Sequence, residues 1–151
     1  MAKVGIISIT DGTGLKVIAR SVGAFRKGLR RGMQATAPEI VKEVQRGILD
    51  PPKTGNIYFI NGNLHQASAP GEFPAELTGN LRMGVESKVN GYSELVVGDT
   101  VDYGKELEEG SETTRPRPHL KTGALNKARE LGQNLGRGVA VMLDAAAYGS
   151  K

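Results

Sequence analysis

The chain has 151 residues, the length of one domain, and we expect a single domain over 1–151. Hydrophobic residues make up 38% and charged residues 24%, which is typical of a globular protein in water. There is no cysteine, which excludes disulfides and thiolate metal sites. No run of 18 apolar residues occurs and the first residues do not resemble a signal peptide, so we expect a protein that acts without a membrane.

The net charge of +4 is the sum of three segments whose charges alternate in sign. Residues 1–54 carry ten Lys and Arg against four Asp and Glu, a balance of +6. Residues 55–114 carry three against ten, or −7, and residues 115–151 carry seven against two, or +5. The basic ends could bind nucleic acid, or could bind the acidic face of a neighbouring copy. Solvated helix faces are the plain alternative, and no aromatic residues alternate with the basic ones to stack on bases.

The N-terminal third predicts a strand followed by a long helix. Residues 3–10 (KVGIISIT) have the composition of a short strand and end at a turn dipeptide. Capping-box spacing around Pro38 predicts a kink or break near residues 36–38. The prolines at 51–52 end the helix. Apolar residues at steps of three or four mark one face of this helical stretch: Leu15, Ile18, Val22, Phe25, Leu29, Met33, Ala37, Val41, Val44 and Ile48.

The middle of the chain predicts hairpins and one long loop. Residues 55–60 predict a strand before a tight turn at Asn61 and Gly62. Residues 67–79 contain two prolines and no periodicity, which predicts a long loop of the kind that is often functional or mobile. Alternation over 81–89 predicts a second strand, paired with 93–98. An odd-length turn between these two strands is favoured because it aligns their apolar faces.

A final helix follows the proline-spaced segment 115–120. Gly132, Gly136 and Gly138 weaken it, and they would make sense if another backbone packs close by. Its predicted apolar stripe is Leu125, Ala128, Leu135, Val139 and Met142 or Leu143. The fold class is therefore α+β: a long kinked N-terminal helix and a C-terminal helix packed on a small, mainly antiparallel sheet, with a long extended loop or hairpin at about 55–79.

The sequence contains no recognisable catalytic or cofactor-binding constellation. Gly12 and Gly14 open a helix, but Val17 stands where a dinucleotide-binding fingerprint needs its third glycine. His65 and His119 lie in loop-like contexts without a ligand pattern. The acidic run from Asp99 to Glu112 could hold a hard cation, but it lacks calcium-loop spacing, which favours a solvated or intersubunit face. We expect no catalytic residue, no metal ligand, no cofactor and no enzymatic activity.

Three stretches together resemble a family of phage proteins. The first is the opening strand and helix around Gly14. The second is residues 53–58 (KTGNIY), then ASAPGE at 67–72, a Pro-Ala pair, and TGNLR at 78–82. The third is YGKELEEGS at 103–111, then RPHL and Ala-Leu. In this order they are similar to the tail-completion family of long-tailed bacteriophages, also described as minor tail components or head-tail connectors. The match departs at Gly104, usually alanine, and at His119, usually phenylalanine; Glu109 replaces an apolar residue, and the proline before the last Ala-Leu is missing.

The resemblance implies a structural virion protein of the phage neck. Such a protein forms a homo-oligomeric ring, expected to be six-fold, at the head-proximal end of the tail, with DNA crossing its channel. Its partners would be itself and the adaptor, stopper, terminator or tail-tube proteins, with transient DNA contact and no membrane. The alternative from the residues alone is a sequence-independent nucleic-acid-binding protein that uses the basic N-terminal helix.

The resemblance also singles out two groups of residues. The loop expected to contact a neighbouring subunit comprises Ala69, Pro70, Gly71, Glu72, Phe73 and Pro74. The positions expected to organise the scaffold are Thr78, Gly79, Leu81, Tyr103, Leu107, Glu108, Gly110, Pro118 and Leu120.

Overall fold

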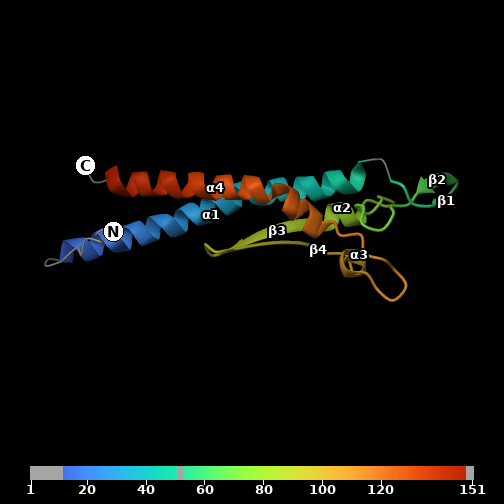
Figure 1. The fold of residues 1–151 in the computed structure, drawn as a ribbon, viewed down its shortest axis with the longest axis horizontal. Helices are drawn as coiled ribbons and strands as arrows, with labels where there is room; N and C mark the ends of the chain where they lie inside the picture. The colour runs from blue at the N-terminus through green and yellow to red at the C-terminus, as the bar shows by residue number, and fades with distance from the viewer. Residues whose placement is uncertain (1–11, 51–52, 149–151) are drawn as a thin grey trace, which may run out of the picture.

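Two long antiparallel helices form the frame of the fold. The structure is a computed structural model, and it describes residues 12–50 and 53–148. Helix α1 (Gly12–Leu49) and helix α4 (Leu120–Tyr148) lie side by side (Figure 1). The chain between them forms β1 (Ile57–Ile60), β2 (Asn63–Gln66), α2 (Asn80–Gly84), β3 (Val85–Asn90), β4 (Glu94–Asp99) and α3 (Gly104–Glu109). The predicted α+β class is confirmed, while the predicted strand at 3–10 lies outside the described residues.

Helix α1 passes Pro38 without interruption, so of the predicted kink or break the break is wrong. Proline removes one helical hydrogen bond, but side-chain contacts hold the helix at this point. Thr36 is fully buried; its Oγ1 donates to the Gly32 carbonyl at 3.0 Å and accepts from Asn134 Nδ2 of α4 at 3.0 Å. Packing of α4 along α1 therefore outweighs the local preference for a break.

Glycines allow α1 and α4 to approach closely. A Cβ added at Gly28 would lie 2.5 Å from the Cα of Val139, and one at Gly138 would fall on the Gly28 carbonyl oxygen. The expectation that another backbone packs on the α4 glycines is thus confirmed at Gly138. Gly132 and Gly136 have no atom within 4 Å of such a Cβ, so they lie on the outer side of the helix.

This close approach corrects the predicted stripe of α4. Leu125, expected to be buried, is 64% exposed, and Ala128 is exposed as well. Gly123 and Gly138 face α1 instead, with Gly123 against the side chain of Val44. Hydrophobic periodicity places the largest apolar residues inside, but here the closest contact requires the smallest ones.

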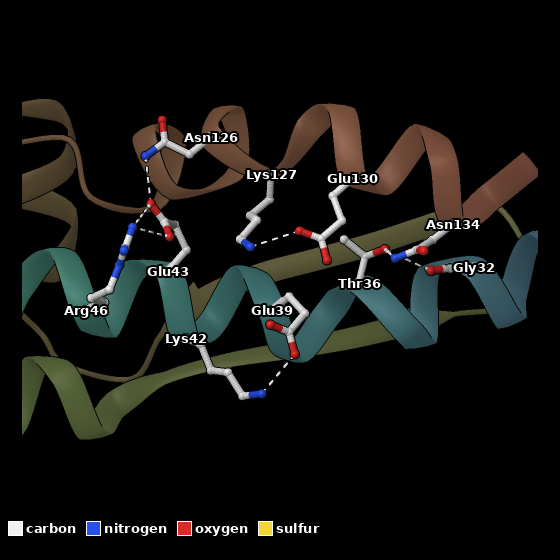
Figure 2. Close-up of polar contacts among 10 residues, drawn as sticks. All are labelled: Gly32, Thr36, Glu39, Lys42, Glu43, Arg46, Asn126, Lys127, Glu130 and Asn134. Carbon is white, nitrogen blue, oxygen red and sulfur yellow. Dashed lines mark hydrogen bonds and ion pairs between the residues drawn. The ribbon is translucent and has the colours of Figure 1, made fainter.

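Some of the polar contacts of α1 and α4 cross between the two helices and others lie within one helix (Figure 2). Glu43 accepts hydrogen bonds from Asn126 of α4 at 2.9 Å and from its neighbour Arg46 at 2.8 Å. Burial raises the pKa of Glu43, but these hydrogen bonds outweigh it and leave the pKa below its ordinary value. Lys127 on α4 pairs with Glu130 at 2.8 Å.

The strands form two separate hairpins instead of one central sheet. The β1–β2 turn has φ of 49° at Asn61 and 83° at Gly62, the dihedral signs of a type I′ turn, so this predicted hairpin is confirmed. Strands β3 and β4 are joined by the three residues 91–93 and pair Val89 with Leu95. The predicted odd-length turn is confirmed.

Residues 80–84 form helix α2 where the sequence predicted the start of a strand. Leu81 is buried and Met83 is 67% exposed, so the predicted alternation, which placed both side chains on one face of a strand, is wrong here. Leu81 and Val85 are four apart and reach the same core. That core lies where β3 and α2 pack on the C-terminal half of α1, and its buried members are Ile40, Val44, Ile48, Leu81 and Val85.

Candidate subunit interface

The first part of the loop at 67–79 is joined to Thr54 by the carboxylate of Glu72. Glu72 Oε2 accepts the N–H of Ala69 at 2.8 Å and of Thr54 at 3.1 Å, and its Oε1 accepts the Thr54 hydroxyl at 2.5 Å. The hydroxyl of Thr54, followed by the two N–H groups, holds the pKa of Glu72 below its ordinary value. These hydrogen bonds therefore fix the conformation of the loop between Ala69 and Glu72 and hold this part of it beside Thr54.

The expected subunit-contact loop is only partly available to a partner. Phe73 packs its ring against Gly47 of α1, where a Cβ would come within 2.5 Å of the ring, and Pro74 is buried. Pro70 and Gly71 form the exposed tip, while Ala69 and Glu72 are half-buried. A neighbour that contacts this loop would meet residues 70–71 first.

Two of the stretches that carry the resemblance come together in one apolar cleft of about 450 Å³. The loop supplies one wall and the start of α3 supplies the other. Arg117 ties the two walls, because its Nε donates to the Ser68 carbonyl at 3.1 Å and its N–H to the Leu107 carbonyl at 2.6 Å. Six of the singled-out residues line the cleft: Pro74, Thr78, Gly79, Leu81, Tyr103 and Leu107.

The remaining singled-out residues build the junction between α3 and α4. Glu108 accepts the backbone N–H groups of His119, Leu120 and Lys121 at 2.7 to 2.9 Å and so caps α4. Gly110, with φ of 82°, ends α3. The Pro118 carbonyl accepts the hydroxyl of Thr122 at 2.7 Å. Leu120 packs against the core as the first residue of α4.

His119 is fully buried between two carboxylates. Its Nε2 lies 3.1 Å from Asp99 Oδ2 and its Nδ1 lies 3.2 Å from Glu108 Oε2, although the second contact lacks hydrogen-bond geometry. The loop-like context of His119 is right, and its buried position corresponds to the packing role. His65 is half-buried and lines the cleft. Within the described ranges no three His, Asp or Glu side chains are grouped to hold a metal ion.

The β1–β2 hairpin exposes large apolar side chains that the sequence analysis did not single out. Ile57, Phe59 and Leu64 are 63%, 75% and 76% exposed. Figure 1 shows this hairpin at the end of the molecule opposite the start of α1 and the end of α4. The sequence does indicate this apolar surface, because four consecutive apolar residues at 57–60 leave neither face of the strand polar.

Charge is separated in space as well as along the chain. Exposed carboxylates surround α3 at the hairpin end of the molecule: Asp102, Glu106, Glu109 and Glu112. Exposed basic residues lie on the N-terminal half of α1: Arg20, Arg26, Lys27, Arg30 and Arg31. Helix α3 and the N-terminal half of α1 lie toward opposite ends of the molecule in Figure 1. The described chain therefore carries exposed charge of opposite sign on α3 and on the N-terminal half of α1.

Over the described part of the chain, neither long helix has the apolar stretch that spanning a bilayer requires. No family model, curated protein or solved structure matches this chain, so its similarity to the tail-completion family stays an expectation from the sequence.

Proposed function

We propose that this chain is a structural subunit of the bacteriophage neck, not an enzyme. It forms a homo-oligomeric ring, six-fold like the tail, at the head-proximal end of the tail tube, and it helps to join tail to head. DNA passes through the channel with transient contacts only. The protein is assembled in the host cytoplasm and retained in the virion.

The observation that carries this proposal is the pair of unlike surfaces at the two ends of the molecule. A ring requires one patch of a subunit to meet a different patch of the next subunit. The acidic α3 end and the basic half of α1 supply such a pair, because attraction between them fixes head-to-tail order. The order of the motifs in the sequence supports a place in the neck.

The proposal is tested in the parent phage and in solution. Deletion of the gene should leave full heads and separate tails in negative-stain micrographs, and normal joined particles would overturn the neck role. In native mass spectrometry the purified protein should assemble, and the assembly should loosen in molar salt because exposed charge pairs are screened. A ring unaffected by salt would exclude the electrostatic contribution.

One observation favours a second candidate, sequence-independent nucleic-acid binding. Among the described residues no carboxylate lies within ion-pair distance of Lys27, Arg30 or Arg31 on α1. Basic side chains without a carboxylate partner can neutralise the phosphates of a nucleic acid. Micromolar DNA binding that weakens steeply with salt, and that is lost in Arg30→Glu, would favour this candidate. Equal binding by wild type and variant would argue against it.

A further inference from the structure

The β1–β2 hairpin has one face of large apolar side chains that nothing in the described chain covers. Phe59 pairs with Leu64 across the strands, and Ile57 lies two residues before Phe59, so all three share one face. The opposite face carries His65, which lines the cleft. An antiparallel pair in water usually keeps one face polar. The face of Ile57, Phe59 and Leu64, here called the hairpin face, is therefore suited to burial against a partner.

The hairpin also lacks the features that prevent an exposed strand pair from associating with another chain. Within residues 12–50 and 53–148 it pairs with no third strand, and residues 55–71 contain no charged residue. An isolated two-stranded hairpin is only marginally stable in water. The partner that stabilises it should be present whenever the protein is, and a second copy of the chain meets that condition.

We infer that the hairpin face docks on α1 of a second copy, at the segment of Val22 and Phe25. This inference rests on the proposed function, because it specifies the contact that joins neighbouring subunits of the ring.

The receiving surface is a stretch of α1 that the β3–β4 hairpin leaves uncovered. The guanidinium of Arg26 lies 4.7 Å from the ring centre of Tyr92, so the β3–β4 turn ends beside Arg26. Val22 is one helical turn beyond that contact. Val22 and Phe25 are 44% and 46% exposed although they continue the apolar stripe of α1. The segment thus offers apolar side chains that no neighbour within the described chain buries.

Charge complementarity supports a head-to-tail arrangement. Val22, Arg26 and Arg30 follow at four-residue steps and so lie in one row on α1, which places basic groups beside the apolar segment. The β1–β2 hairpin lies toward the same end of the molecule as α3, which carries the exposed carboxylates (Figure 1). Each surface therefore has an apolar part and a charged part of opposite sign, as the core and rim of an interface do.

The two surfaces cannot meet within one chain. Residue 22 precedes the end of α1 by 27 residues, which corresponds to about 40 Å of helix. Three exposed side chains supply at most a few hundred Å², less than the about 800 Å² per partner of a stable interface. The charged surfaces must therefore contribute the remaining contact area, and disruption of either part should weaken assembly.

Cysteine cross-linking tests the contact directly, because the natural chain has no cysteine. The double variant Phe59→Cys with Val22→Cys should give a ladder of covalent oligomers under mild oxidation. The matched control pairs Phe59→Cys with Leu125→Cys, a side chain that is 64% exposed on α4, and it should give no ladder. Equal ladders from both pairs would overturn the inference. Efficient dimers from Phe59→Cys alone would overturn it in favour of hairpin-to-hairpin contact.

Complementation separates this inference from the ring proposal. Phe59→Ser and Val22→Glu should each abolish assembly while leaving the circular dichroism spectrum unchanged. Mixed together, they should form a one-to-one dimer, because each retains one intact surface. If both variants assemble as the wild type does, the hairpin contact is wrong and the ring proposal stands. A wild-type protein that stays monomeric and does not cross-link overturns both.

Discussion

Nε2 of His119 lies 3.1 Å from Oδ2 of Asp99, and the two side chains are only 0% and 6% exposed. The same carboxylate occupies the space beside Gly104, where an added Cβ would overlap Asp99 Oδ1. Gly104 and His119 are two of the positions at which the sequence departs from the tail-completion pattern, with its alanine and phenylalanine. They are coupled through Asp99, since histidine supplies the carboxylate with a partner and glycine leaves it room.

This coupling predicts a non-additive mutant cycle. Gly104→Ala should cost about 1–3 kcal/mol of unfolding free energy, because its methyl group displaces Asp99 from His119. In an Asp99→Ala background the same change should cost less than about 0.5 kcal/mol. Urea unfolding of the four proteins measures the coupling. Gly98→Ala is the matched control, because nothing lies within 4 Å of its added Cβ. Additive costs would show that Asp99 does not link the two positions.

Removal of the α4 cap should destabilise the protein. Glu108→Ala leaves three backbone N–H groups at the start of α4 without their carboxylate, which should cost about 1–2 kcal/mol. Glu109→Ala, next in sequence, removes a 66% exposed side chain whose ion pair with Lys105 spans 3.9 Å. It should change stability by less than about 0.5 kcal/mol. Chemical denaturation compares the two, and equal losses would contradict the capping role.

Local features of the fold were predictable and close packing was not. The Asn61–Gly62 turn and the odd turn after Asn90 follow from residues next to one another in sequence. Leu125 was misplaced because hydrophobic periodicity favours a leucine over a glycine at a buried position. Which glycine faces α1 depends on Gly28, more than 100 residues away. The cleft likewise joins residues distant in sequence, so no single segment could predict it.

The glycines of α4 should respond in opposite directions to the same substitution. Gly138→Ala places a methyl group on the backbone of α1 and should destabilise by about 1–3 kcal/mol. Gly136→Ala, two residues earlier, has open space and should stabilise the helix by about 0.5–1 kcal/mol. Thermal unfolding at constant protein concentration gives both signs. Destabilisation by Gly136→Ala would mean that its open side is covered in solution, as it would be inside an assembly.

Acid should release the loop at 67–79 through Glu72. Its folded-state pKa is lowered by the hydrogen bond from the Thr54 hydroxyl and those from the N–H groups of Ala69 and Thr54. A carboxyl group with a lowered folded pKa contributes stability above its unfolded pKa, near its ordinary value of 4.5. That contribution is lost as pH falls through the lower folded value.

The amide shift of Ala69 reports this titration in NMR spectra. It should change with a midpoint below 4.5, and in Glu72→Gln the change should disappear, because the amide side chain does not ionise. Gln retains one carbonyl acceptor, so the variant should keep the fold but open the loop more readily to protease at neutral pH. A midpoint at or above 4.5 in the wild type would mean that the ionised form gains nothing from its three donors, and Glu72 would then not be what holds the loop.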